Sequence, residues 1–457
     1  MGSRQRGFFL LATLLGGGVA LHLAKASHAN ALAAAPDSAL ASGDSLAASQ
    51  LAASTSAPWN PPAAVSPDER WERVVRWPGR IASWPLRQLG AFVDRSLVTA
   101  EETKFFPKAI AITQIPAAHG VAIEAASLGD RTGLGAGVRV KPPRIGDFFT
   151  AEWDGSTLQY SRTTLRGGYG PTWLEYRYEW RPEDGFFGFG LSSSPDDGSN
   201  YAAEEQHLLL TAGHELRAGP GRLALSGWAG ARSLVTRPGK SSHSPSFQQV
   251  FPSLSGTIDL HESYRTRGAA VTYDARVRGQ HRWIRGMQAK VSAEGFQEQS
   301  RARLLFPASD APSRFTRLRY DWEGGWSFFS ADPRTVRLAL GLVDQRPDRG
   351  VMLLPDLARL GGREGLAGFE PRRFHDLDAA IARLTYLFPI GKHLEVDLHS
   401  EAGGAYGDFW RDARLSTLRH SHGIALRPRS DTAMLGALGF DWSPETARLH
   451  YSIGGAE

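Results

Sequence analysis

Residues 174–181 read LEYRYEWR: aromatic or aliphatic side chains occupy every second position, and charged side chains occupy the others. Successive side chains of a β-strand point to opposite faces, so this order gives one apolar face and one charged face. The same alternation recurs at 269–278, 316–328 and 394–401. Repetition of a strand pattern from about residue 119 onward predicts an all-β protein.

Two features favour a membrane barrel over a soluble sandwich, in which strands also alternate. The polar face carries full charges of both signs in strand after strand, as expected of a hydrated lumen. The apolar face is rich in Tyr, Trp and Phe near strand ends, like the aromatic girdles of outer-membrane barrels. We therefore expect a 16-stranded antiparallel transmembrane β-barrel over residues 119–457. Its strands are expected at 133–142, 146–155, 156–164, 171–181, 184–192, 203–216, 220–233, 266–277, 284–298, 314–328, 334–346, 378–390, 392–403, 416–427, 431–442 and 446–454.

The residues before the barrel indicate export. Residues 1–29 combine a basic start, a short apolar stretch and small residues at candidate cleavage points, as in a secretory signal peptide. Residues 30–67 are rich in Ala, Ser and Pro and are expected to form a disordered linker. Residues 68–118 include apolar residues spaced by three and four among arginines, which predicts a short amphipathic helical segment. This segment suits either a membrane surface or packing against the main domain.

Composition excludes several classes of protein. The 457 residues include no cysteine, which excludes a disulfide scaffold, a thiolate metal site and a cysteine nucleophile. The formal net charge of +5 is small and the charges are interspersed, so nucleic acid is not an expected partner. Outer-membrane lipids and lipopolysaccharide are the expected counterparts, because basic residues lie beside aromatic ones at predicted interfaces.

Two insertions interrupt the strand rhythm, at 235–265 and 347–377. The first is polar and is expected to be an extracellular loop. Residues 360–374 of the second read LGGREGLAGFEPRRF, with four glycines in eight residues. Glycine lets a backbone turn tightly and approach another wall closely. We expect this loop to fold back into the barrel interior with its arginines meeting lumenal carboxylates; a mobile surface loop is the alternative. The residues expected to matter are Gly361, Gly362, Arg363, Leu366, Gly368, Phe369, Arg372 and Arg373.

This loop, followed by YLFPI at 386–390 and SEAGG at 400–404, resembles the C-terminal signature of the BamA/TamA family of bacterial outer-membrane proteins. Segments 186–190, 268–276 and 448–454 are similar to further strands of that family. The resemblance implies an outer-membrane barrel that inserts or exports proteins or lipids, often through a seam between its first and last strands. It also implies that Glu401 is the lumenal acid that meets the loop.

Three departures from the family pattern qualify this resemblance. The arginine at the family's loop tip is here Ala367, so Arg363, Arg372 or Arg373 is expected to meet Glu401 instead. No periplasmic POTRA modules precede the barrel, which suggests an accessory periplasmic protein as a partner. The chain also ends without the usual terminal aromatic residue.

Enzymatic function is not expected. The sequence has no nucleophile elbow, zinc-protease motif or phosphate-binding loop, and we expect no catalytic residue, no metal and no cofactor. His420 and His422 would share one strand face but lack further ligands nearby. The sequence thus predicts a barrel that assists insertion or translocation, with a passive channel or structural barrel as the alternative and a membrane-bound hydrolase as a weaker third.

Overall fold

The computed structural model describes residues 120–126, 135–143, 145–146, 148–239, 244–278, 283–303, 312–328, 334–350, 352–362, 365–390, 394–428 and 437–452. All of them lie in the second of two units, Arg70–Glu457. The predicted signal peptide (1–29), linker (30–67) and helical segment (68–118) lie outside the described residues. Among the described residues, none of the helices is long and apolar enough to cross a bilayer.

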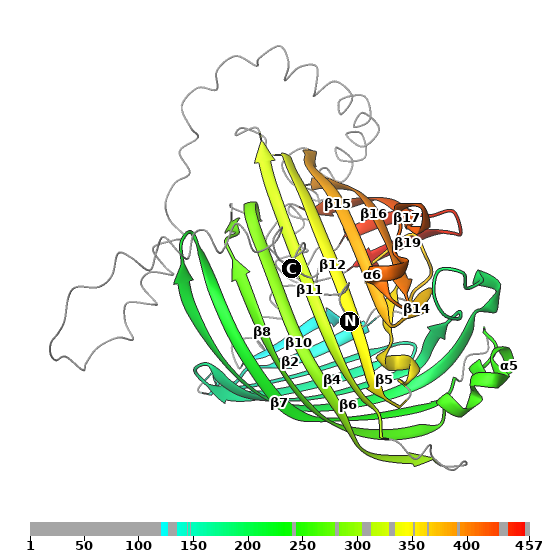
Figure 1. The fold of residues 1–457 in the computed structure, drawn as a ribbon. Helices are drawn as coiled ribbons and strands as arrows, with labels where there is room; N and C mark the ends of the chain where they lie inside the picture. The colour runs from blue at the N-terminus through cyan, green and yellow to red at the C-terminus, as the bar shows by residue number, and fades with distance from the viewer. Residues whose placement is uncertain are drawn as a thin grey trace, which may run out of the picture. The chain divides into compact units, whose positions relative to one another are not determined.

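The described residues form one large antiparallel sheet (Figure 1). Its strands are β1 (Val121–Ala126), β2 (Gly135–Val140), β3 (Phe149–Ser156), β4 (Ser161–Tyr169), β5 (Thr172–Phe186), β6 (Ser199–Ala218), β7 (Gly221–Pro238), β8 (Leu260–Asp274), β9 (Val277–Arg278), β10 (Trp283–Arg303), β11 (Arg314–Phe328), β12 (Arg334–Arg349), β15 (Asp378–Ile390), β16 (Leu394–Tyr406), β17 (Arg419–Pro428), β18 (Ala437–Trp442) and β19 (Ala447–Ser452).

Antiparallel ladders join these strands in chain order, from β1 to β19. The two-residue β9 pairs with β10, the same strand that β8 pairs with, so the sheet has sixteen strand positions within the described part of the chain. The predicted all-β class, antiparallel pairing and strand number are confirmed.

The predicted and observed strands agree in number but differ at two places. No separate strand exists at 184–192: residues 184–186 end β5, and the chain then turns through Gly188 and Gly190, whose φ angles are 103° and 69°. Glycine adopts such angles without strain, so the FFGFG pattern at 186–190 makes a bend and not an alternating strand. The strand β1 was missed, because its sequence VAIEAA has no aromatic residues or strict alternation of charge.

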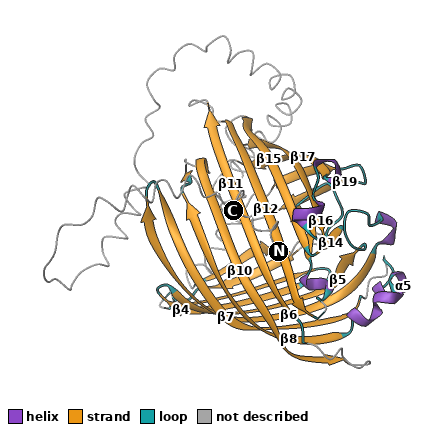
Figure 2. Cartoon of the chain, in the orientation of Figure 1, coloured by secondary structure: helices purple, strands orange, loops and turns teal. Residues whose placement is uncertain are grey.

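The two ends of the sheet differ. Short turns, such as 170–171 and 219–220, join strands at one end, which we call the turn end. Long connections occupy the other end, the loop end, where the helices gather (Figure 2). These elements are η1 (Pro195–Asp197), α5 (Phe247–Val250), η2 (Pro252–Thr257), η3 (Leu354–Asp356), α6 (Phe409–Asp412), η5 (Leu415–Thr417), and the two-stranded sheet of β13 (Ala358–Leu360) with β14 (Phe374–Asp376). The insertion predicted at 235–265 is shorter than expected, because β7 and β8 extend into it.

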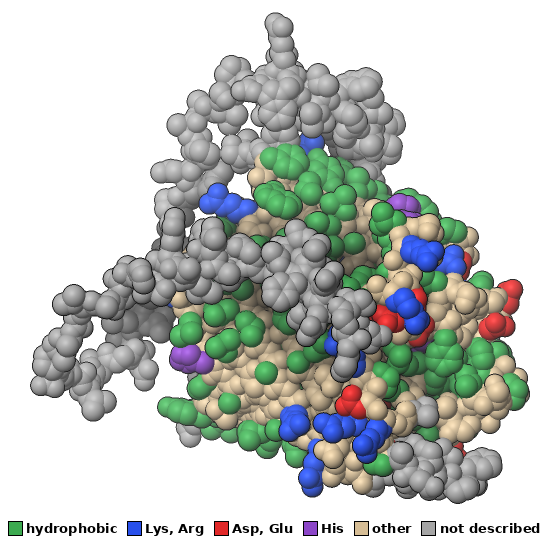
Figure 3. All heavy atoms as spheres, in the orientation of Figure 1, with side chains coloured by type: hydrophobic (Ala, Val, Ile, Leu, Met, Phe, Trp, Pro, Cys, Tyr) green, Lys and Arg blue, Asp and Glu red, His purple; other side chains and the backbone are tan. Residues whose placement is uncertain are grey.

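The alternation of the sequence sorts side chains between the two faces. On the outer face, register partners on adjacent strands form an exposed apolar band, as in Val271, Val291 and Tyr320; Val271 and Val291 are each 46% exposed. Green hydrophobic side chains are spread over the face seen in Figure 3. The inner face holds charged side chains such as Arg181 and Arg232, which are buried.

The main apolar cluster lies at the loop end, beneath the long connections. It joins the end of β5 and the start of β6 to the two loops that follow β7 and β12, and its members are Phe186, Tyr201, Ala203, Phe247, Ile258, Leu354 and Leu357. Aromatic edge-to-face contacts, such as that between Phe186 and Phe251, add to the burial of these residues. Through Leu354 and Leu357, the cluster holds the start of the connection between β12 and β15, hereafter the long loop (350–377), over the inner face of the sheet.

Candidate functional site

The entrance of the long loop is anchored by a buried carboxylate. Asp356, at the end of η3, forms an ion pair with Arg232 of β7 and is fully buried. The backbone carbonyl of Asp356 accepts hydrogen bonds from Arg317 of β11 at 3.0 Å and from Gln345 of β12 at 2.8 Å. The loop is therefore tied at this point to the inner faces of three strands.

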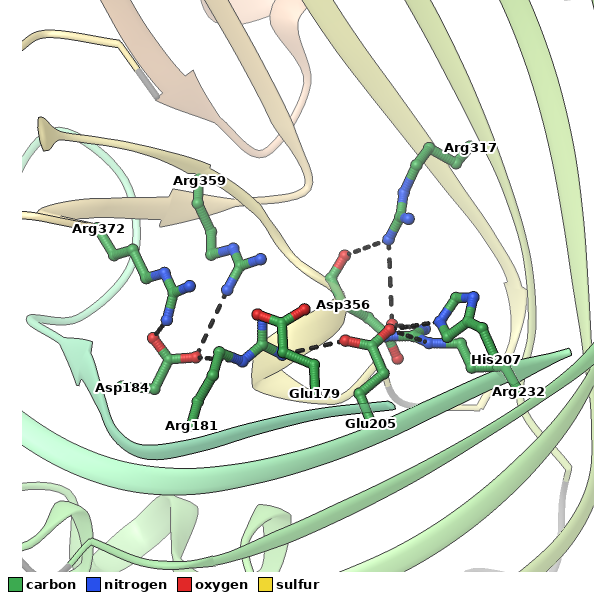
Figure 4. A network of polar contacts seen from close by, with 10 residues as sticks. All are labelled: Glu179, Arg181, Asp184, Glu205, His207, Arg232, Arg317, Asp356, Arg359 and Arg372. Carbon is green, nitrogen blue, oxygen red and sulfur yellow. Dashed lines mark hydrogen bonds and ion pairs between the residues drawn. The ribbon is translucent and has the colours of Figure 1, made fainter. Parts of the chain in front are cut away.

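A second buried carboxylate, from the wall, anchors the later part of the loop. Asp184 of β5 pairs with Arg372 of the loop, and its carboxylate lies 3.6 Å from both Arg359 and Arg181. Glu205 of β6 links this group to the first anchor, because it contacts Arg181 at 3.1 Å and Arg232 at 2.7 Å. Figure 4 shows the resulting chain of alternating charges.

This network adds ion pairs to the apolar packing that also holds the loop. Each buried carboxylate in it contacts at least two arginines, which compensates its removal from water. Loss of one member leaves its partners buried with less compensation, so the members depend on one another. The loop side contributes Asp356, Arg359 and Arg372, and the wall contributes the other members.

The tip of the long loop packs tightly against the wall. Leu366 and Phe369 are buried with Phe374 and with small residues of β15 and β16. Gly361, Gly362 and Gly365 have φ angles of 119°, 75° and 145°, which only glycine adopts readily. A Cβ atom on Gly368 would lie 2.4 Å from the backbone of Trp442, so glycine permits the close approach to β18.

Glu401 of β16 is buried against this tip, at 1% exposure. Its Oε2 accepts hydrogen bonds from the backbone N–H of Ala367 at 2.5 Å and from the hydroxyl of Ser421 at 2.7 Å. Its Oε1 lies 3.2 Å from Nε of Arg383 on the neighbouring strand β15. Glu401 thus meets the loop through a backbone amide, and its cation comes from the wall.

Arg363, Arg372 or Arg373 was expected to meet Glu401. The structure describes Arg372 and Arg373, and both contact other residues, so the expectation was wrong for these two. Arg372 pairs with Asp184, and Arg363 lies outside the described residues. Arg373 is fully buried; it donates to the Ser193 hydroxyl and carbonyl at 2.6 Å and contacts Glu445 at 2.7 Å. The carboxylate of Glu401 has other partners: the backbone N–H of Ala367, the hydroxyl of Ser421 and the guanidinium of Arg383.

Arg373 joins parts of the chain that are far apart in sequence. Ser193 lies in the connection between β5 and β6, and Glu445 lies in the turn between β18 and β19. The guanidinium also lies 4.8 Å from the centre of the Phe374 ring. A second arginine, Arg448 of β19, donates to the carbonyl of Phe369 at 2.9 Å. The last hairpin is therefore fastened to the long loop by two arginines.

A buried histidine lies near the exit of the loop. His375 of β14 is fully buried beside Phe186, with ring centres 5.1 Å apart. Burial, together with the charges of Arg359 and Arg372, lowers the pKa of His375 well below its usual range. The docked loop therefore holds this imidazole in its neutral form.

Polar groups also cross the inner face of the last strands. His399 of β16 reaches over β17 to lie 2.8 Å from Asp441 of β18, and His450 of β19 contacts the same carboxylate at 2.8 Å. Gly423 of β17 makes this crossing possible, since a Cβ atom there would lie 1.9 Å from Oδ1 of Asp441 and 2.4 Å from Nε2 of His399. Within the described residues, no group of three or more His, Asp or Glu side chains is arranged to hold a metal ion.

Two cavities remain around the loop. One of about 790 Å³ lies beside the charge network and is lined by residues that include Arg177, Arg319 and Leu360. The other, of about 480 Å³, lies against Gly365 and Glu401. The first is lined largely by charged and polar groups, so it suits water and ions better than an apolar ligand, whereas the second has a mixed lining that includes Trp322 and Leu340.

Sequence reasoning missed most of the charge network. Asp184, Asp356, Arg232 and Arg359 were not singled out. The alternation placed Arg181 and its strand neighbours on the charged face. However, no feature of the nearby sequence distinguishes a member of the network from any other charged residue on the inner face. Arg232 and Asp356, for example, are 124 residues apart in sequence, so the pairing depends on the fold.

The fold and site together define a large antiparallel β-barrel architecture whose long loop is anchored over its inner face. No family model matches the sequence, and no curated protein matches it. Among solved structures, the chain is similar to BamA from Haemophilus ducreyi lacking POTRA domains 1–3, with a TM-score of 0.50 and 13% identity over 73% of this chain and 69% of that one.

CdiB from Acinetobacter baumannii (TM-score 0.42, 12% identity, 72% of this chain and 57% of that one) and CdiB from Escherichia coli (TM-score 0.46, 12% identity, 72% and 61%) are also similar. The expected resemblance to the BamA/TamA family is confirmed at the level of the fold.

Proposed function

We propose that this chain is an integral outer-membrane β-barrel of the BamA/TamA type that takes part in inserting or translocating proteins or lipids. It would reach the outer membrane through its N-terminal signal peptide and would act without catalysis. Outer-membrane lipids, lipopolysaccharide and a periplasmic accessory protein are its proposed partners. The observation that carries this proposal is the uneven height of the strand wall.

The wall is tall on one side and low on another. Strands β6 and β7 have 20 and 18 residues, whereas β3 and β4 have 8 and 9. At about 3.3 Å per residue and a tilt of about 40°, the tall strands rise about 45–50 Å and the low ones about 20–23 Å. The low side falls short of the roughly 30 Å of a typical hydrocarbon core.

A short wall forces the adjoining lipid to thin. A thinner bilayer lowers the free-energy barrier that a polar polypeptide or a lipid headgroup must cross to enter the membrane beside the barrel. The low strands β3 and β4 follow β1 and β2 in the sheet, next to the seam that the family resemblance implies. Thinning at that place favours an insertion role over a purely structural one.

Reconstitution tests the proposal. The protein is placed in lipid vesicles, a urea-unfolded outer-membrane barrel is added, and its folding is followed by the electrophoretic shift of heat-resistant barrels. We expect faster folding than in empty vesicles. Equal rates with and without the protein would refute the insertion role.

A disulfide experiment then asks whether the first and last strands must separate. The chain has no cysteine, so a pair placed with one cysteine in β1 and one in β19 meets no native thiol, and its oxidation to a disulfide first tests whether the two strands lie side by side. Oxidation of this pair is expected to slow client folding, and reduction to restore it. The control joins Leu210→Cys and Ala229→Cys, register partners on β6 and β7, and should leave client folding unchanged.

A passive channel is the second candidate, favoured by the polar cavity of about 790 Å³ beside the charge network. A steady large conductance in planar bilayers, together with no effect on client folding, would support it. The anchored loop argues against a wide open pore, because its base and tip are both fastened to the wall.

A further inference from the structure

Five exposed arginines form two neighbouring rows on the outer face at the loop end, hereafter the arginine rows. Register partners share a face of the sheet, so the ladders across β8, β10, β11 and β12 define these rows. The first consists of Arg265, Gln297, Arg314 and Arg349; the second consists of Arg267, Gly295, Thr316 and Arg346. Lys and Arg side chains gather at the lower edge of the face shown in Figure 3.

The arginine rows carry excess positive charge. In the described part of the chain, Arg265, Arg267 and Arg349 have no carboxylate partner. Arg314 contacts Asp348 at 3.4 Å, but both side chains are more than half exposed, so this pair is weak. Arg346 contacts Asp344 at 2.7 Å. Three guanidinium groups are thus free to bind an anion from outside.

The surface beside the arginine rows is apolar and smooth. The next row toward the turn end contains Ala269, Ala293 and Leu318, and the row after that contains Val271, Val291 and Tyr320. Ala229 and Ala231 continue the exposed small-residue surface onto β7. Small side chains leave a shallow face against which acyl chains can lie, with the guanidinium groups at its border.

We propose that this face binds a lipid whose headgroup carries phosphate. Phosphate oxygens accept charge-assisted hydrogen bonds from arginine, which presents its donors in a matching fork. The acyl chains lie along the rows that contain Ala269, Ala293, Val271 and Val291. The arginines that have no carboxylate partner among the described residues border these rows at the loop end, where the headgroup would lie. The site requires the barrel to lie in a bilayer but does not require insertion activity.

Native mass spectrometry of the full chain in detergent tests this site, with diphosphorylated lipid A as the probe. The variant replaces Arg265, Arg267 and Arg349 by glutamine. Three exposed arginines at the turn end, Arg217→Gln, Arg222→Gln and Arg285→Gln, provide a control with the same change of charge. We expect about fivefold weaker binding for each guanidinium removed from the rows, and about 100-fold for all three. The control should bind as the unmodified protein does.

Equal loss of binding in the variant and the control would overturn the proposal, because net charge alone would then explain it. So would equal binding of lipid A stripped of its phosphates. Inorganic phosphate is tested as a competitor: displacement of lipid A at equal concentration would show that a free anion, and not a lipid, occupies the rows. The client-folding assay is run separately, so failure of lipid binding and failure of insertion are distinguishable.

Discussion

Replacement of Glu401 by alanine is expected to release the tip of the long loop. The substitution removes the carboxylate that accepts a hydrogen bond from the Ala367 N–H at 2.5 Å. This hydrogen bond is the direct contact of the carboxylate with the loop. A buried hydrogen bond to a charged group contributes about 1.5–3 kcal/mol. A loss of about 2 kcal/mol raises the population of released loop about 30-fold. The pair with Arg383 adds little, because that arginine is 40% exposed and returns to water.

Trypsin cleavage after Arg372 or Arg373 measures loop release. Arg373 is fully buried while the loop is docked, so cleavage requires opening. When opening and closing are fast compared with cleavage, the rate follows the open population. We expect cleavage of E401A about 30 times faster than that of the unmodified chain. E401Q keeps an acceptor oxygen, and its increase should be about fivefold.

The matched control is E215Q, which removes a carboxylate that is 55% exposed and paired with Arg222 at the turn end. Its loop should be cleaved at the unmodified rate. If E401A is also cleaved at the unmodified rate, Glu401 does not hold the loop, and the charge network alone accounts for docking.

Three further predictions concern other parts of the site. R373A should lower the free energy of unfolding by about 3–5 kcal/mol, measured by urea titration, since it leaves Glu445 without its buried partner; R373K should recover part of this. G423A should lower unfolding stability by about 1–3 kcal/mol through steric conflict with side chains crossing the strand, whereas G256A, where a Cβ meets open space, should be neutral. Because the docked loop lowers the pKa of His375, docking should be complete above the unfolded value of about 6.5 and weaken as the pH falls below it, so tryptic cleavage should become faster as the pH is lowered. An identical pH response in H375Q would show that other groups cause it.

Much of the architecture was predictable because it rests on a local periodicity. Alternation in segments such as 174–181 and 314–328 reports which face each side chain takes; the predicted limits 314–328 are those of β11, and the predicted start of β5 is one residue from the observed one. The failures occurred where local pattern and backbone geometry diverge. At 186–190, aromatic residues and glycines mimic alternation, but positive φ angles at Gly188 and Gly190 end the strand.

The candidate site was predictable only as a region. The glycine cluster at 361–368 marked a loop that approaches a wall closely, and Glu401 was named as a residue that it meets. The group that meets Glu401 was not predictable, because the choice between an arginine and the Ala367 amide depends on how deep the tip lies. That depth is set by packing of Leu366 and Phe369 against β15 and β16.

The sequence by itself determined the class of fold and the face on which each strand residue lies, because a period of two is a property of neighbouring residues. It also determined the excess of arginines, although not that five of them align in two rows. Only the tertiary structure decided which charges pair. Asp184 and Arg372, or Asp356 and Arg232, lie far apart along the chain and meet because strand register and loop path bring them together. Electrostatic partners depend on distance in space, which no local pattern encodes.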